Sequence, residues 1–409
     1  MYREIRRCQI IEFLKTRGTS SVNELARLFE TTGQTIRSDL NYLQGEGFVI
    51  RHHGGVSIKK HLLQEDLVKS GTAELSSRLP GVNTSIATDY KYKGLSRMTV
   101  QVCVFGSFNV DIVAKVNRFP LPGETVIASG SSVGPGGKGG NQAFAASAAG
   151  ASVHFATKLG KDQFNQFARS HIETSTLTSH SIFESEKEPT GSAVIYVNSE
   201  AENKIAITPG ANHDVSHEEI ASLMPYIAES KVLLVQLENN IEATLQAANV
   251  AKELGIAVIV NPAPYRKEVE SLLPYTDIIT PNETEASEMS GVVIKDLETA
   301  KEAAQIIHAK HVKSVIITMG KRGLLIYEGD KFMHIPAFHA VPVDTTGAGD
   351  AFNGALSSSI AMGKPLIQAA LYANAFASLA VEREGAANMP TVELVEARMM
   401  QQTVTAKQI

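Results

Sequence analysis

The sequence predicts an α/β protein with a doubly wound parallel sheet and a small β lid, preceded by a separate helical head. From Val100 onward, short apolar runs alternate with amphipathic helical stretches, as in parallel sheets that are covered on both faces. A second set of apolar runs breaks this alternation and predicts the lid. Residues 1–60 carry a charge of +4 and the remaining residues −9. A basic head on an acidic body indicates that the two parts meet different partners.

Composition narrows the class of protein. The chain has 409 residues, of which 43% are hydrophobic and 20% charged, which excludes a disordered chain and a small disulfide-stapled one. Cys8 and Cys103 lie far apart in apolar surroundings, as expected of buried thiols in a reducing cytoplasm. Glu4 and Glu12 occupy positions that are apolar in a signal peptide, and no apolar run has the length of a membrane span. We therefore expect a cytoplasmic protein that is neither exported nor inserted in a membrane.

The head, residues 1–60, contains three helical patterns and a hairpin pattern. Residues 3–17 predict an amphipathic helix with an apolar row of Ile5, Cys8, Ile11 and Leu14 and an opposite face of Arg3, Arg6, Arg7 and Lys15. Ser20 or Ser21 can cap a second short helix, and a third begins near Thr32 and ends at the glycines 45 and 47. Residues 48–58 predict a hairpin that turns at Gly54 and Gly55. Together these elements predict a winged helix-turn-helix.

Three segments of this head, SVNELARLF, TIRSDLNYL and GFVIRHHGG, resemble the DeoR family of bacterial sugar-responsive regulators. The resemblance implies that double-stranded DNA is a partner and that the third helix enters the major groove. It assigns base contacts to Gln34, Thr35, Arg37 and Ser38, and backbone contacts to Arg51, His52 and Lys59. Family members usually carry an arginine where Ser38 stands. The alternative is a winged helix that contacts proteins, with its Arg and Lys residues on a solvated face.

A connector and a larger domain follow the head. Residues 61–98 show no sustained period and predict a linker with a short helix near 62–68, and the body spans residues 99–409. Its clearest strands are predicted at 100–105, 231–237, 256–260, 277–280 and 314–318. Residues 125–129, 190–197 and 204–208 predict antiparallel strands of the lid, which would also serve as a dimer surface.

A glycine-rich stretch, Gly134 to Asn141, runs directly into an Ala-rich helix. Glycines allow a ligand to approach the backbone, and Lys138 and Asn141 can hydrogen-bond to that ligand. The stretch is not a phosphate-binding Walker A loop, because Gly139 follows the lysine instead of Ser or Thr. An ordinary glycine-rich turn is an equal alternative.

The stretch from Asp344 to Asp350 carries the strongest chemical signal. Its glycines precede a helix predicted at 351–360, so backbone N–H groups and the positive end of the helix dipole would surround an anion. A carboxylate beside such a site can remove a proton from an attacking hydroxyl while the N–H groups stabilise a transferred phosphoryl group. The alternative is that Asp350 only caps the helix.

Acidic residues also follow the strand predicted at 277–280. In the stretch from Pro281 to Glu285, carboxylate and amide oxygens could organise a hydrated Mg²⁺. An acid-rich helix N-terminus is the common alternative.

The three stretches together resemble the pfkB, or ribokinase, family of carbohydrate kinases over residues 99–392. Residues 136–142 resemble the first family signature and residues 343–354 the second, while Asn109-Val110-Asp111, Gln236-Leu237-Glu238 and residues 280–286 resemble ribokinases in particular. This chain has Gly140 in place of a usual alanine, and its stretch 385–390 is one residue shorter than the family pattern.

The resemblance implies a role for each matched position. Asp350 would be the catalytic base, beside an anion hole of Gly347, Ala348 and Gly349. The sugar-binding positions would be Asn109, Val110, Asp111, Gly137, Lys138, Gly139, Gly140, Asn141 and Glu238. The ATP-binding positions would be Asn282, Thr318, Met319, Gly320, Lys321, Arg322, Gly323, Gly349, Asp350 and Asn374. Glu285 would hold Mg²⁺ through water, and K⁺ would lie by Asp344, Thr346, Ala380, Arg383, Gly385 and Asn388.

The activity implied by the resemblance is ATP-dependent phosphorylation of a pentose, with ribose favoured, by a homodimer whose head regulates transcription. Two alternatives remain open at this point. The body could be a catalytically weak sugar sensor of a regulator, or it could phosphorylate deoxyribose or another furanose.

Overall fold

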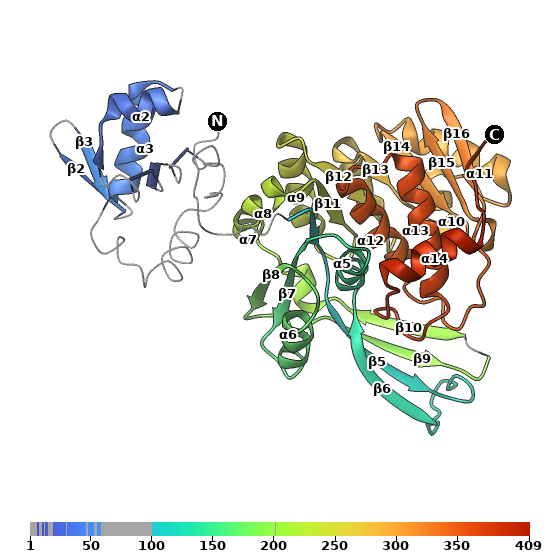
Figure 1. The fold of residues 1–409 in the computed structure, drawn as a ribbon. Helices are drawn as coiled ribbons and strands as arrows, with labels where there is room; N and C mark the ends of the chain where they lie inside the picture. Colours follow the sequence, from blue (N-terminus) through green and yellow to red (C-terminus); the bar gives the residue numbers. More distant parts are fainter. Residues whose placement is uncertain are drawn as a thin grey trace. The chain divides into compact units, whose positions relative to one another are not determined.

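The computed structural model describes residues 6–58, apart from 8, 9, 12, 15–18, 30, 46, 47, 53 and 54, and residues 100–409, apart from 201. The expectations for Cys8, Lys59 and the linker lie outside these residues. The chain divides into two compact units, one with the described residues up to 58 and the segment 216–228, and one with the other described residues. We describe each unit by itself (Figure 1).

The head has the predicted elements of a winged helix-turn-helix. The described residues between 6 and 14 are helical, and they precede β1 (Thr19–Ser20), α2 (Val22–Leu28), α3 (Gly33–Gly45), β2 (Val49–His52) and β3 (Gly55–Ile58). The Ser21 hydroxyl caps α2 by accepting a 3.1 Å hydrogen bond from the Glu24 N–H. Leu14, Ile36 and Leu40 are fully buried in a shared apolar core. Strand β1, which the sequence did not predict, pairs with β3 and completes an antiparallel sheet of order β1-β3-β2.

Arg6 and Arg7, which the helical pattern places opposite the apolar row, are not exposed to solvent. Each residue is only 7% exposed. Their Nε atoms lie 2.6 Å and 3.0 Å from the carboxylate of Asp39, which is itself buried in α3. The guanidinium of Arg7 also lies 3.8 Å from the ring centroid of Tyr42. Both arginines are therefore held inside the head by a buried carboxylate and, for Arg7, an aromatic face.

The body is built on a ten-stranded sheet. From one edge its strands are β17 (Lys407–Gln408), β16 (Lys331–Ile335), β15 (Leu324–Glu328), β14 (Ser314–Thr318), β13 (Ile278–Ile279), β12 (Ala257–Val260), β11 (Val232–Val235), β4 (Val102–Phe105), β7 (Val153–Gly160) and β8 (Ser179–Ser185). The seven strands from β14 to β8 are parallel, as predicted. Strands β15, β16 and β17 add an antiparallel edge that the sequence did not predict.

Helices cover the parallel strands, and their bounds are α5 (Lys138–Ala148), α6 (Asn165–Glu173), α9 (Ile241–Glu253), α10 (Glu283–Ser290), α11 (Leu297–His308), α12 (Ala348–Ala361), α13 (Leu366–Ala380) and α14 (Val392–Gln401). Two more helices, α7 (His217–Ser222) and α8 (Met224–Glu229), begin in the segment 216–228, which belongs to the other unit. On β4, Val102 and Val104 belong to the core shared with α5, α12 and α13. Cys103 alternates with them and points to the opposite face. This buried thiol confirms the expectation for Cys103, and burial raises its pKa to about 12.

The lid is a four-stranded sheet of order β10-β9-β5-β6 that extends from the body (Figure 1). Its strands are β5 (Asn109–Lys115), β6 (Gly130–Gly136), β9 (Ser192–Val197) and β10 (Asn203–Thr208). The antiparallel expectation is correct for β9 with β10, but β5 pairs with β9 in parallel. The predicted strand at 125–129 is wrong: the strand is residues 130–136, because these residues pair one by one with β5. The predicted glycine-rich stretch is therefore divided: Gly134 to Gly136 belong to a lid strand, and the residues from Lys138 onward belong to α5.

The order of the parallel strands locates a crevice. Strand β4 lies between β7 and β11, so the chain leaves the centre of the sheet first toward one edge and later toward the other. Ligands of doubly wound folds bind at such a switch point, beyond the carboxyl ends of the strands. Here those ends are Phe105 and Val235, and the lid strand β5 starts four residues after the first of them.

Candidate active site

Asp350 lies in the first turn of α12, close to the start of the helix. Gly347 caps this helix with φ 77°, a left-handed conformation that favours glycine, and no side chain provides a cap. Asp350 is thus not the helix cap, which was the alternative interpretation of this residue. A Cβ atom added at Gly349 would meet nothing within 4 Å. The backbone at the N-terminus of α12 is therefore open to a ligand of negative charge.

Both carboxylate oxygens of Asp350 are held by amides from α5. Asn141 Nδ2 donates to Oδ2 at 3.0 Å, and Gln142 Nε2 donates to Oδ1 at 2.9 Å. Gln142 Nε2 also donates to Asn261 Oδ1 at 3.0 Å, and Gln142 Oε1 accepts from Gln236 Nε2 at 2.7 Å. All these side chains are buried. The chain of amides fixes the carboxylate, and the sequence analysis assigned no role to Gln142, Gln236 or Asn261.

Glu238 follows β11 and joins the two sides of the crevice. Its Oε2 atom accepts hydrogen bonds from Ser107 Oγ at 2.6 Å and from the Lys138 N–H at 2.9 Å. Gly139 allows this close approach, because a Cβ atom there would lie 2.4 Å from the carbonyl carbon of Gly106. The N-terminus of α5 is therefore packed directly against the loop that leaves β4.

The other predicted sugar-binding residues lie at the base of the lid. Asp111 sits on β5 beside Gly136, where a Cβ atom would lie 2.1 Å from Asp111 Oδ1. Asn109 is 3% exposed, and the side chain of Val110 is buried in the core, which leaves only its backbone available. Gly137 has φ 85°, and a Cβ atom at Gly140 would lie 3.2 Å from the ring of Phe108.

Charged groups of the crevice shift one another's pKa values. Burial, together with the charges of Glu238 and Asp350, raises the pKa of Asp111 to about 7. Burial also raises the pKa of Glu285, against the opposing effects of the Asn282 N–H and of Lys138. Burial lowers the pKa of Lys138, but Asp350, Glu238 and Glu285 outweigh it and raise that pKa. A protonated Lys138 among carboxylates is therefore the favoured state of this site.

Two cavities meet at the N-terminus of α12. A cavity of about 610 Å³ is lined by seven predicted ATP-binding or anion-hole positions, Thr318, Gly320, Lys321, Gly323, Ala348, Gly349 and Asn374. A cavity of about 710 Å³ lies under the lid, lined by Asp111, Asp344, Thr346, Gly385 and Asn388 among others. Thr345 lines both cavities. The two cavities therefore share part of the loop that precedes α12, and Gly349 lines the first of them.

Four predicted ATP-binding residues do not line the first cavity, namely Asn282, Met319, Arg322 and Asp350. Asn282 caps α10 and forms a β-bridge with Thr318, while Met319 is buried. Arg322 makes an ion pair with Glu283. Asn282 and Glu285 form a reciprocal capping box in which both hydrogen bonds are 2.9 Å long. One oxygen of Glu285 is thus engaged by the helix terminus.

The positions predicted to hold a monovalent cation are only partly brought together. Asp344 Oδ1 accepts from the Thr346 N–H at 2.8 Å and Oδ2 from the Gly385 N–H at 3.0 Å, so this carboxylate joins the two loops. Burial raises the pKa of Asp344, but these hydrogen bonds outweigh it and hold the pKa below its ordinary value. The remaining two positions, Ala380 and Arg383, do not line the cavity under the lid.

Within the described residues, no group of three or more His, Cys, Asp or Glu side chains could by itself hold a metal ion. No helix in the same residues has the length and apolar character to span a membrane.

In the head, the predicted DNA-contacting side chains are accessible. Gln34, Arg37 and Ser38 of α3 are exposed, and Thr35 is half-buried, with a 2.9 Å hydrogen bond between its hydroxyl and that of Thr32. The Arg51 guanidinium donates to Asn41 Oδ1, which links β2 to the exposed side of α3. His52 is exposed as well.

Comparison with known proteins identifies both parts of the chain. Residues 100–392 match the family model of the pfkB carbohydrate kinases. The chain belongs to this family. Residues 6–61 match the DeoR-like helix-turn-helix domain, so the two resemblances noted in the sequence are confirmed. This pfkB kinase is a phosphotransferase with a ribokinase-like α/β fold, and enzymes of its family use ATP.

The relatives of this pfkB kinase include ribokinases. It is 37% identical to a ribokinase of Haemophilus influenzae over 300 residues, which cover 72% of this chain and 96% of the relative. It is 32% identical to a deoxyribokinase of Salmonella typhi over 296 residues, covering 72% and 97%. The solved ribokinase of Thermotoga maritima aligns with a TM-score of 0.67 and 35% identity, covering 74% of this chain and 99% of the other.

Proposed function

We propose that this pfkB kinase transfers the terminal phosphoryl group of ATP to a pentose, with ribose the favoured substrate and Asp350 the general base. The meeting of the two cavities at Thr345 supports this proposal, because it lets a nucleotide and a sugar approach each other beside the N-terminus of α12. Asp350 would take the proton from the terminal hydroxyl of the sugar. That oxygen would bond to the γ-phosphorus as the bond to the β–γ bridging oxygen breaks and ADP leaves.

The backbone of Gly347, Ala348 and Gly349 would stabilise the charge on the transferred group. We propose that Glu285 holds hydrated Mg²⁺ with the nucleotide, because its second oxygen is not used by the capping box. The ion, when bound, neutralises phosphate charge. The pair of loops joined by Asp344 is where we propose that K⁺ binds, because a carboxylate whose pKa is held below its ordinary value lies there.

A panel of pentoses, hexoses and nucleosides tests the proposal by ADP release, with Asp350→Asn as the blank. Turnover that is fastest with ribose supports the proposal. Turnover that is fastest with deoxyribose would instead make this protein a deoxyribokinase, like its Salmonella relative. A body that binds a pentose tightly without turnover would instead support the sugar-sensing alternative. An intact base and open anion-binding backbone favour activity over sensing, since a sensor needs only the sugar contacts.

We propose further that residues 1–60 bind double-stranded DNA and regulate transcription in response to the sugar, with domain boundaries at 60 and 98. The exposed polar residues of α3 support DNA binding. Gel-shift titrations with and without ribose and ATP test the coupling, and identical DNA affinity in both conditions would refute it.

We also propose that the protein is a homodimer that pairs through the lid. Val133, Ile112, Val194 and Ala206 form one row across its four strands. Val133 and Val194 are 53% and 40% exposed. An apolar row on a sheet face is typical of a contact surface. Sedimentation velocity tests this, with Val133→Glu expected to give monomers.

A further inference from the structure

We propose that Asn212 is a positioning residue for the sugar site: it sets the direction in which the amide of Asn109 faces the substrate. This inference rests on the proposed function, which makes Asn109 a sugar ligand. Asn212 lies in the short 3₁₀ helix η3 (Gly210–His213), directly after the lid strand β10, and is 1% exposed. No role was expected for Asn212 from the sequence.

Three hydrogen bonds engage the side chain of Asn212. Its Oδ1 accepts from the Phe108 N–H at 3.1 Å, and its Nδ2 donates to the Phe108 carbonyl at 3.3 Å. The same Nδ2 donates to Asn109 Oδ1 at 2.8 Å. The first two bonds fix which way the Asn212 amide faces, so the third necessarily presents a donor to Asn109.

The consequence for Asn109 follows because a side-chain amide has an oxygen that accepts and a nitrogen that donates hydrogen bonds. Because Asn212 occupies Oδ1, the Nδ2 group of Asn109 is the half left for other partners, and it has no hydrogen bond to any other residue in the described part of the chain. A sugar hydroxyl at this position would therefore have to accept a hydrogen bond from Asn109. A reversed Asn109 amide would offer the sugar an acceptor, but it would place its Nδ2 donor against the Nδ2 donor of Asn212.

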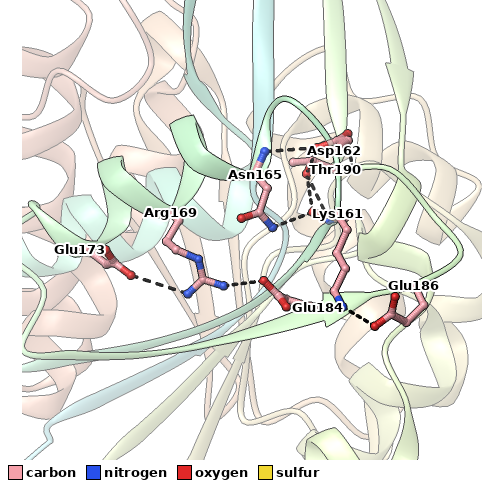
Figure 2. Close-up of polar contacts among 9 residues, drawn as sticks. Lys161, Asp162, Asn165, Arg169, Glu173, Glu184, Glu186 and Thr190 are labelled. Atoms are coloured by element: carbon pink, nitrogen blue, oxygen red, sulfur yellow. Dashed lines mark hydrogen bonds and ion pairs between the residues drawn. The ribbon is translucent and has the colours of Figure 1, made fainter.

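A glycine makes room for this contact between amides. A Cβ atom at Gly191 would lie 2.2 Å from Asn212 Nδ2 and 2.3 Å from Asn109 Oδ1. Gly191 is itself fixed, because its carbonyl accepts from the Val110 N–H at 2.9 Å. Its neighbour Thr190 donates its N–H and its hydroxyl to the carboxylate of Asp162, at 2.9 Å and 2.7 Å (Figure 2).

These contacts converge where the lid joins the body. Asn109 begins β5, Gly191 precedes β9, and Asn212 follows β10, so one buried amide connects the roots of three lid strands. The Asn109 amide is thus oriented by the base of the lid, whatever the position of the lid tip. Apolar neighbours would not distinguish the two orientations of this amide, because the orientations have the same shape and differ only in hydrogen bonding.

A double-mutant cycle on the full-length protein tests the inference. Asn212→Ala should raise the KM for ribose about tenfold, with kcat within about twofold and the KM for ATP unchanged, as expected for one lost substrate hydrogen bond. Asn109→Ala should have a similar effect. If Asn212 acts through Asn109, the double variant should again show about a tenfold rise instead of a hundredfold rise.

Two further variants keep the test sharp. Gly191→Ala should reproduce the rise in sugar KM by forcing the two amides apart, which covers the case in which Asn212→Ala fails to fold. Asn240→Ala is the matched control: within the described residues its side-chain amide bonds to the backbone of Val215 alone, so the substitution should leave the sugar KM unchanged. Ribose binding by calorimetry provides the same cycle without turnover.

Additive effects in the cycle, or an unchanged sugar KM in both Asn212→Ala and Gly191→Ala, would overturn the inference while leaving the proposed function intact. A wild-type protein that neither binds nor phosphorylates any pentose would overturn the proposed function, and the inference with it.

Discussion

The carboxylate of Asp39 lies 2.6 Å from Nε of Arg6, and the two side chains are 1% and 8% exposed. This ion pair connects the first helix of the head to the middle of α3, whose other face carries the proposed DNA contacts. Arg7 shares the same carboxylate. A buried carboxylate with two arginines therefore controls how the recognition helix is held.

Replacing Asp39 with Ala should destabilise the head by about 3–5 kcal/mol, because two buried guanidinium groups lose their anionic partner. Hydrogen exchange should then show lost protection over 33–45, and DNA affinity should fall. ADP release by the kinase body should not change. Gln44→Ala, an exposed position of the same helix, serves as the control. Unchanged protection in the Asp39 variant would contradict the structural role given to this ion pair.

Asp350→Asn should lower turnover by about 10²–10⁴-fold, the usual contribution of a general base. The asparagine cannot accept hydrogen bonds from both Asn141 and Gln142, since one of its two terminal atoms is a donor. We therefore also expect a loss of stability of about 1–3 kcal/mol, with sugar affinity retained. ADP release and thermal unfolding measure the two effects. Near-wild-type turnover would rule out Asp350 as the base.

Gly136→Ala should raise the KM for ribose while leaving the KM for ATP unchanged. The added Cβ atom would lie 2.1 Å from Asp111 Oδ1 and must displace that carboxylate. We expect a rise of about tenfold or more, equivalent to one lost hydrogen bond to a charged group. Gly134→Ala lies on the same strand, where an added Cβ atom meets nothing within 4 Å, and should behave as wild type. Equal effects of the two substitutions would show that strand propensity, not Asp111, is responsible.

The raised pKa of Asp111 predicts that the stability of the folded protein depends on pH. Its pKa of about 7 in the folded protein exceeds its ordinary value of 3.8, so between these pH values the folded state holds a proton that the unfolded chain has released. Stability is therefore lost as the pH rises through this window. Asp111→Asn should be more stable than wild type by on the order of 2 kcal/mol at pH 8, and equally stable near pH 4. Urea unfolding at several pH values, without sugar, measures this difference. A gap that widens at low pH would contradict the assignment.

Much of the fold could be predicted from the sequence because local patterns agree with it. The parallel strands are short apolar runs, and the helix that begins at Ala348 follows Gly347, the glycine that caps its N-terminus. Strand β6 was misplaced because Gly130–Gly136 is poor in strand-forming residues. Its conformation is imposed by pairing with β5, which no local pattern contains.

Long-range polar contacts account for the missed parts of the site. The burial of Arg6 and Arg7 could not be predicted, because their buried partner Asp39 lies 33 and 32 residues away. Asn212 contacts residues more than 100 positions earlier in the chain. The only local signal for it is its place directly after a strand that the sequence did predict, in the segment Pro209-Gly210-Ala211-Asn212. Gln142 and Gln236 lie in quoted motifs, but only the folded structure shows that they meet.

The continuity between β6 and α5 has a practical consequence for protein engineering. Gly136 ends the lid strand and Gly137 caps α5. Within the first two turns of this helix, Asn141 and Gln142 donate hydrogen bonds to Asp350. A chimaera that borrowed the lid of another kinase would have to take these turns with it, or the graft would change the register of the residues that hold the base. The unit to transfer is therefore the lid together with the first two turns of α5, and the junction of the chimaera should lie inside this helix.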